Sequence, residues 1–215
     1  MVTWADAEPT MVCAANEEES KMTIIASLSI SLDGFYTGED ASAELPMGRG
    51  GNRLHEWFAH DVADRAQLTA DEILAAEFER TGAMIMGRDS YDHAEALWGE
   101  SPPFEMPIFV VTHRSREDDV RKGTTFTFVD SMDTAIERAL QAANGKAVGL
   151  HGGGAIRQGL QMRVLQELQL HLVPVLLGSG RRLFSRSGDE PIAMETLRVA
   201  EGPSVTHLKY ALPEM

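Results

Sequence analysis

Short apolar runs alternate with amphipathic segments along most of the chain. In the first run, residues 22–34, the apolar residues are nearly continuous: Ile24, Ile25, Ala26, Leu28 and Ile30. A strand of this kind is expected in the middle of a sheet that is covered on both sides. Similar runs predict further strands at 83–87, 107–112, 125–130 and 147–150.

Segments with helical spacing separate these runs. The stretch 131–145 begins with a capping serine, repeats apolar residues at i, i+3, i+4 and i+7, and ends at Asn-Gly. Thr69 and Glu72 have the capping-box spacing, ahead of a helix that should end at about Arg80. Two shorter helices are predicted at 54–59 and, after a polar turn at 88–93, up to Trp98.

The last part of the chain is expected to consist of strands alone. A long strand is predicted from Glu167, with a bulge at Pro174, and a short extension at 181–184. Residues 194–202 and 204–212 alternate and are joined by Gly-Pro, which predicts an antiparallel pair at the sheet edge. Together these elements predict an α/β fold with a mostly parallel central sheet and antiparallel C-terminal strands, whereas the residues after Gly34 up to Asn52 are expected to form a loop.

Length, charge and cysteine content limit the number of domains, the binding partners and the compartment that we expect. The length of 215 residues suits one domain over residues 22–215, preceded by a flexible acidic leader at residues 1–21. A net charge of −14 argues against binding to nucleic acid or to an anionic membrane. The single cysteine, Cys13, excludes an intramolecular disulfide and favours the reducing cytoplasm. No apolar run reaches the ~18 residues that a membrane span needs.

The stretch 146–160 is the centre of the predicted organisation: a short strand ends in Gly152, Gly153 and Gly154, and a helix begins at about Ala155. Glycines permit a tight turn or close approach of a ligand, and the first N–H groups of a helix can bind a phosphate. A glycine-rich connection that only packs strand against helix explains the same residues equally well. The spacing differs from the G-x-G-x-x-G fingerprint, so this signal alone is weak.

Five short segments give the chain a family resemblance. They are SLDG at 31–34, MGRDSY at 86–91, VVTHR at 110–114, GGG at 152–154 and LVPVLLGSGRRLF at 172–184. In order and spacing they resemble the dihydrofolate-reductase-like superfamily, in the branch of the riboflavin-biosynthesis reductase domain, from Met22 to about Leu212. The segment GRGGNRLHEW at 48–57 is similar to small stand-alone bacterial members.

The resemblance implies a three-layer fold that binds NADPH along the C-terminal ends of parallel strands, and it suggests a homodimer. Polar residues that follow the strands support this reading, because backbone N–H groups, hydroxyls and guanidinium groups there can meet phosphates. Arg114 and its neighbours would suit a 2′-phosphate and favour NADPH over NADH. Solvated arginines at strand ends are the alternative. The candidate cofactor-binding residues are Gly87, Arg88, Asp89, Ser90, Thr112, His113, Arg114, Gly152, Gly153, Gly154, Ala155 and Ile156.

Asp33 is the candidate catalytic and substrate-binding carboxylate, because it ends a central strand beside a glycine. It could orient the substrate or assist its protonation, or, as in a common Asp-Gly turn, it could only bind backbone N–H groups. Trp57, Phe58 and Trp98 are candidate walls for a flat substrate, although aromatic residues at helical spacing also suit a core.

Several positions depart from the patterns that the resemblance implies. Glu56 or Asp61 falls where dihydrofolate reductases carry an acid, but without a clean match to the motif. His151 stands where riboflavin-pathway reductases usually have an acidic residue, and 165–168 reads LQEL instead of the usual VDEL. These departures put folate reduction and the exact riboflavin-pathway reaction in doubt.

The histidines do not predict a metal site. His93-Ala94-Glu95 spells half of a zinc deaminase motif, but the second half needs thiols that the chain lacks. The leading hypothesis is an NADPH-dependent reductase that transfers a hydride to a small heterocyclic, carbonyl or imine substrate, either pterin-like or riboflavin-precursor-like. The alternative is a nucleotide-binding protein of the same fold without turnover.

Overall fold

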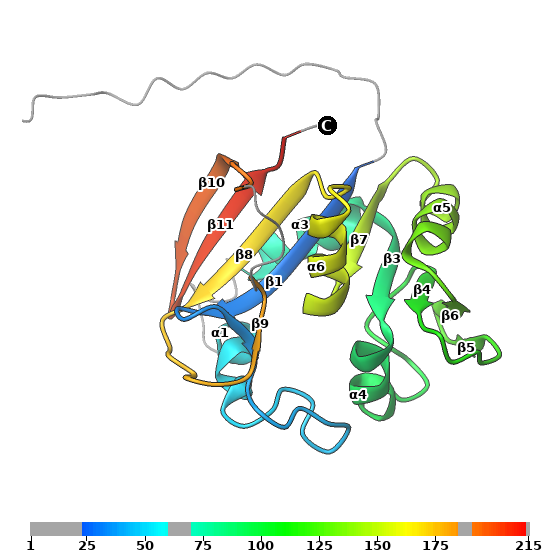
Figure 1. Ribbon diagram of the computed structural model, residues 1–215, viewed down its shortest axis with the longest axis horizontal. Helices are drawn as coiled ribbons and strands as arrows, with labels where there is room; N and C mark the ends of the chain where they lie inside the picture. The colour runs from blue at the N-terminus through cyan, green and yellow to red at the C-terminus, as the bar shows by residue number, and fades with distance from the viewer. Residues whose placement is uncertain (1–22, 60–69, 185–190, 214–215) are drawn as a thin grey trace, which may run out of the picture.

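The computed structural model describes residues 23–59, 70–184 and 191–213, and its centre is one large sheet. The strand order is β10-β11-β8-β1-β7-β3-β4-β6-β5 (Figure 1). The parallel strands are β1 (Ile24–Ser31), β3 (Thr81–Gly87), β4 (Ile108–Val111), β6 (Thr124–Val129), β7 (Ala147–His151) and β8 (Glu167–Val173). The antiparallel margins are β5 (Asp119–Arg121), β10 (Glu195–Gly202) and β11 (Val205–Ala211).

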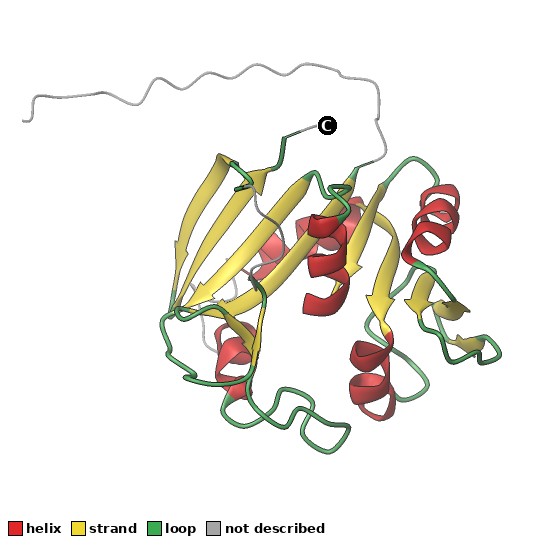
Figure 2. Cartoon of the chain, in the orientation of Figure 1, coloured by secondary structure: helices red, strands yellow, loops and turns green. Residues whose placement is uncertain are grey.

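Helices lie on both faces of the sheet (Figure 2). On one face, α5 (Met132–Ala142) and α6 (Gly153–Gln161) bury Ala139 and Ile156 against alternate residues of β1, β3, β7 and β8. On the other face, the 3-10 turn η1 (Gly51–His55) and α1 (Glu56–Ala59) pack near β8 and β11, and α4 (Arg88–Trp98) packs on β3, β4 and β6. The segment η2 (Ala70–Ala75) is π-helical and continues into α3 (Ala76–Arg80).

This arrangement confirms the predicted fold class. β1 lies inside the sheet with helices over both faces, as its apolar run required. Ser131 caps α5 by accepting a hydrogen bond from the backbone N–H of Thr134 at 3.1 Å. The predicted C-terminal pair is present as β10 and β11, with β10 at the edge.

The polar turn predicted at 88–93 is wrong, because α4 begins directly at Arg88. Two contacts explain why these polar residues form a helix. Arg88 Nε and Asp92 Oδ1 form an ion pair at 2.6 Å one helical turn apart, and Tyr91 is fully buried against β6. Tyr91 is therefore the residue that α4 buries, and the otherwise polar segment 88–93 gives no apolar spacing from which this helix could be predicted.

Three strand predictions also need correction. β8 ends at Val173, so the predicted strand does not continue through Pro174, which has no N–H to donate to a ladder. The loop predicted after Gly34 contains β2 (Phe35–Thr37), which pairs with β9 (Arg181–Arg182) in a separate two-stranded sheet. The short edge strand β5 was not predicted.

Some predictions fall outside the described residues. These are the acidic leader at residues 1–21, the helix-capping residue Thr69 and the carboxylate of Asp61.

Candidate cofactor and substrate site

The ends of three predicted strands lie next to one another. β7, β3 and β4 are parallel neighbours, so their C-terminal ends meet at one edge of the sheet. His151 is in register with Met86, and Gly87 is in register with Val111. The segments at these strand ends, 87–90, 112–114 and 152–156, are thereby gathered at one edge, and we call them the cradle.

Two helix N-termini open toward the cradle. α4 begins after Gly87 and α6 begins after Gly152, and neither has a side-chain hydrogen bond at its cap. The first N–H groups of a helix have no partner within it and carry the positive end of its dipole. Two such ends at adjacent strands form an arrangement that suits a pyrophosphate.

The glycines of the cradle divide into two kinds. A Cβ on Gly152, whose φ is 81°, would lie 2.2 Å from the hydroxyl oxygen of Ser90, and one on Gly153 would lie 2.4 Å from the ring of Tyr36. A Cβ on Gly87 or Gly154 would meet nothing within 4 Å. Both interpretations of the triple glycine therefore apply, but to different residues: two glycines permit protein packing, and Gly154 borders open space.

The two arginines of the cradle share one carboxylate. Asp92 Oδ1 pairs with Arg88 Nε at 2.6 Å, and Asp92 Oδ2 pairs with Arg114 Nη2 at 3.0 Å. Arg88 also lies over the ring of Phe128, whereas the Arg114 side chain is 66% exposed. Asp89, in the first turn of α4, is paired with Arg181 at 3.0 Å. Arg114 is thus the more available of the two cations.

A shallow depression of about 330 Å³ adjoins the turn after β4. Thr112 and His113 line it together with Ser115, Thr134 and Arg138. Thr112 is itself committed to the turn, because its hydroxyl oxygen accepts a hydrogen bond from the Arg114 N–H at 3.0 Å. Arg138 is a further cation that lines this depression together with the predicted cofactor-binding residues Thr112 and His113.

Asp33 is held by hydrogen bonds on both carboxylate oxygens. Ser31 donates to Oδ1 at 2.5 Å, as does the N–H of Leu177 at 3.1 Å, and the N–H of Gly178 donates to Oδ2 at 2.7 Å. The Ser31 hydrogen bond, aided by the two N–H groups, outweighs desolvation and lowers the pKa of Asp33 to about 2. The contacts with Leu177 and Gly178 correspond to the alternative in which Asp33 binds backbone N–H groups. They also leave Asp33 without a proton to donate at neutral pH.

The predicted aromatic walls belong to packed clusters. Trp57 is 2% exposed, donates from Nε1 to the Ser29 hydroxyl at 3.1 Å, and packs beside Val173 and Val205. Trp98 stacks on Phe126 with ring centroids 5.5 Å apart. Trp57 is thus part of the buried core, whereas Trp98 is half-buried beside its aromatic cluster, and a substrate-binding role for these residues stays a prediction. The side chain of Phe58 lies outside the part that the structure describes.

Two histidines that the sequence did not single out form a buried pair. His171 of β8 and His207 of β11 face each other with Nδ1 atoms 2.7 Å apart, and Ser27 Oγ lies 2.8 Å from His171 Nε2. The Trp57 ring covers both imidazoles. Burial first, and neighbouring positive charge second, lower the pKa of His171 to about 3 and that of His207 to about 4. In the sequence, only the alternating pattern of both strands could have indicated that the two histidines lie on the same face of the sheet.

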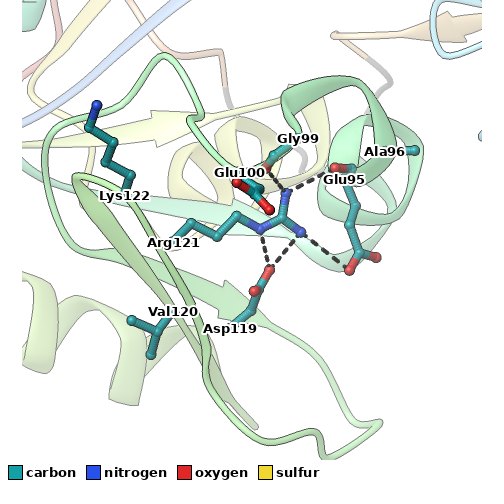
Figure 3. A pocket seen from close by; sticks show the side chains of 8 residues that line it. All are labelled: Glu95, Ala96, Gly99, Glu100, Asp119, Val120, Arg121 and Lys122. Carbon is teal, nitrogen blue, oxygen red and sulfur yellow. Dashed lines mark hydrogen bonds and ion pairs between the residues drawn. The ribbon is translucent and has the colours of Figure 1, made fainter.

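A second depression, of about 680 Å³, lies beyond the C-terminal end of α4 (Figure 3). Its central guanidinium is paired: Arg121 binds Asp119 at 2.7 Å and the carbonyl of Gly99 at 2.8 Å. Glu95 is the glutamate of the incomplete deaminase motif at 93–95. Its carboxylate accepts a hydrogen bond from the Tyr91 hydroxyl at 2.8 Å and pairs with Arg116 at 2.8 Å. This network holds α4 against β5, and its groups are already satisfied.

Two further observations apply to the described residues alone. They contain no group of three histidine, cysteine or acidic side chains that could hold a metal ion. Within the same ranges, every helix is too short or too polar to cross a bilayer.

Comparison with known proteins places the chain in a family. The model of the RibD C-terminal domain matches residues 22–208. Among solved structures, a Shewanella sp. PV-4 protein assigned to riboflavin biosynthesis superposes with a TM-score of 0.68 at 22% identity, over 90% of this chain and 100% of that one. A pyrimidine reductase-like protein of Corynebacterium diphtheriae gives 0.56 at 12%, over 91% of this chain and 94% of that one. RibD of Acinetobacter baumannii gives 0.57 at 15%, over 90% of this chain and 58% of that one.

Because the sequence identities are below 25%, the solved structures establish only the fold, and family membership rests on the match to the family model. No protein of curated function matches the chain. The match over most of its length shows that the chain belongs to the RibD C-terminal domain family, with the dihydrofolate-reductase-like fold of that reductase branch.

Proposed function

We propose that the protein is an NADPH-dependent reductase that transfers a hydride to a small heterocyclic, carbonyl or imine substrate. The observation that carries the proposal is the cradle, in which the ends of β7, β3 and β4 and two uncapped helix N-termini meet at one edge. Membership of a reductase family supports the reaction class.

The residues of the cradle suit a phosphorylated dinucleotide. The N-termini of α6 and α4 would hold the pyrophosphate, with the open space at Gly154 and Gly87 allowing the backbone to approach it closely. Arg114 and His113 would bind the 2′-phosphate, since Arg114 is exposed and close to the depression that His113 lines. When bound, the nicotinamide supplies the hydride.

Asp33 receives a positioning role in this proposal. Because its carboxylate is ionised and occupied, it would hold the 177–178 backbone at the mouth of the site and would not deliver the proton. The proton would come from an ordered water.

The alternative function is dinucleotide binding without turnover. It is favoured by the commitment of Asp33 to the turn and by the burial of Trp57, which leave the substrate side without two of its expected groups. NADPH oxidation with any member of a panel of pterins, pyrimidines and quinones would eliminate this alternative.

We further propose a single domain over residues 22–215 that works as a homodimer in the bacterial cytoplasm. The edge strand β10 supports the dimer, because Leu197 and Val199 are 48% and 62% exposed there beside unpaired backbone groups. Light scattering of the purified protein would measure its mass.

The test of the cofactor site is a fluorescence titration with NADPH. Gly154→Asp adds a carboxylate where acids stabilise a helix but repel a pyrophosphate, so we expect at least a tenfold weaker Kd in a folded protein. Gln158→Glu, which adds the same charge one turn further along α6, is the control and should bind normally. Arg114→Gln should weaken NADPH but not NADH. No saturable binding of NADPH to the wild type at submillimolar concentration would refute the proposal.

A further inference from the structure

Ser27 and His151 lie side by side next to the cradle. Ile25 of β1 is in register with Gly149 of β7, and Ser27 and His151 are each two residues further along. Because side chains alternate, both point to the face that carries α1 and α4, away from the core on the α6 face. Both are half-buried, and His151 directly precedes Gly152.

The tautomers of the histidine pair decide the direction of the Ser27 hydroxyl. When His207 Nδ1 donates to His171 Nδ1, His171 Nε2 carries a proton and donates to Ser27 Oγ, and only this arrangement leaves the Ser27 hydrogen for a ligand; in the opposite arrangement Ser27 donates that hydrogen to His171. His207 Nε2 is buried and has no hydrogen-bond partner within the described ranges. An unpaired buried polar atom is costly, so packing alone does not account for this pair.

The histidines next to Ser27 are neutral at neutral pH. The His151 ring lies 5.9 Å from the Phe104 ring and experiences electrostatic repulsion from His55. Burial lowers the pKa of His151 to about 4, so its imidazole has one N–H donor and one acceptor nitrogen. Within the part of the chain that the structure describes, the electrostatic partners of His151 and His171 are other histidines, without a carboxylate or ammonium group.

We propose that Ser27 and His151 bind the reducible group of the substrate, and that this group is an uncharged carbonyl or cyclic imine. The inference rests on the proposed reductase function. The heteroatom would accept hydrogen bonds from the His151 N–H and the Ser27 hydroxyl, its carbon would take the hydride, and water would supply the proton to the heteroatom. A carboxylate or phosphate would lose its hydration here without a cation to compensate. His171 and His207 are positioning residues, since they contact Ser27 and not the substrate.

The experiment uses the full chain with nitrogen-labelled histidine rings and bound NADPH, whose dihydronicotinamide ring is uncharged, observed by NMR. The probes are benzamide and benzoate, which share a ring and differ in carrying an uncharged carbonyl or a carboxylate. We expect benzamide to shift the ring-nitrogen signals of His151 and to bind at least tenfold more tightly than benzoate.

Matched variants separate recognition from packing. His151→Phe should weaken benzamide about tenfold, the factor that one ordinary hydrogen bond supplies, and His151→Asn, which keeps a donor, should recover part of it. His207→Phe keeps a ring beside Trp57 but removes Nδ1, so the His171 signals should change from one tautomer to a mixture and benzamide should bind more weakly. Gln158→Glu should leave all of these values unchanged.

Two results would overturn the inference: equal affinity for benzoate, or unchanged His151 signals at saturating benzamide. The NADPH titration comes first. If NADPH itself does not bind, the proposed reductase function fails, whereas binding of NADPH without the benzamide response refutes only the assignment of Ser27 and His151.

Discussion

Gly153 and Gly154 are adjacent in α6, yet their surroundings are opposite. A Cβ on Gly153 would lie 2.4 Å from the buried ring of Tyr36, whereas one on Gly154 would meet nothing within 4 Å. We therefore predict that Gly153→Ala destabilises the protein and that Gly154→Ala does not.

The magnitude follows from two opposing effects. Overpacking a well-filled site costs about 1–3 kcal/mol, and replacing glycine by alanine in a helix gains up to about 1 kcal/mol. The two variants should therefore differ by about 2 kcal/mol in the free energy of unfolding. For a chain of this size that corresponds to roughly 4–8 °C in Tm.

Urea unfolding and thermal melting measure the difference, and a second substitution tests its cause. In a Tyr36→Leu background the clash is removed, so Gly153→Ala should cost less than half as much as in the wild type. If Gly154→Ala destabilises as much as Gly153→Ala, or if Tyr36→Leu leaves the penalty unchanged, the assignment of Gly153 to packing is refuted.

Three further predictions concern groups around the site. Because the pKa values of His171 and His207 lie near 3 and 4 in the folded protein, the unfolded chain binds more protons below pH 6.5, and the free energy of unfolding should fall from pH 6.5 toward pH 4; urea unfolding against pH should show a flatter acid limb for His171→Phe. Asp33→Asn should speed hydrogen exchange at Gly178 while NADPH affinity changes little, and loss of the cofactor without faster exchange would contradict the positioning role. Trp57→Ala should cost about 3–5 kcal/mol of stability, as expected for a core ring, and an unchanged Tm would show that the ring is not core.

Local pattern was enough for most of the architecture. The apolar run of β1 and the i, i+3, i+4, i+7 spacing of α5 report which side chains are buried, and burial decides the element that forms. The prediction failed at the start of α4, where the residues are mostly polar. They form a helix because Tyr91 is buried and because Arg88 and Asp92 form an ion pair one turn apart. It also failed at β2 and β5, which depend on partners distant in sequence or at a sheet edge.

The sequence by itself determined where most strands lie along the chain and that the segments 87–90, 112–114 and 152–156 come at strand ends, because each follows an apolar run. Only the tertiary structure decided the order of the strands in the sheet and what individual side chains in and around those segments contact. The sequence gives Gly153 and Gly154 the same letter, but Tyr36, far away in the chain, distinguishes them. Likewise, His171 and His207 become a pair only because β8 and β11 are neighbours in register. Local spacing reports whether a residue is buried, whereas its function depends on which distant residue is buried against it.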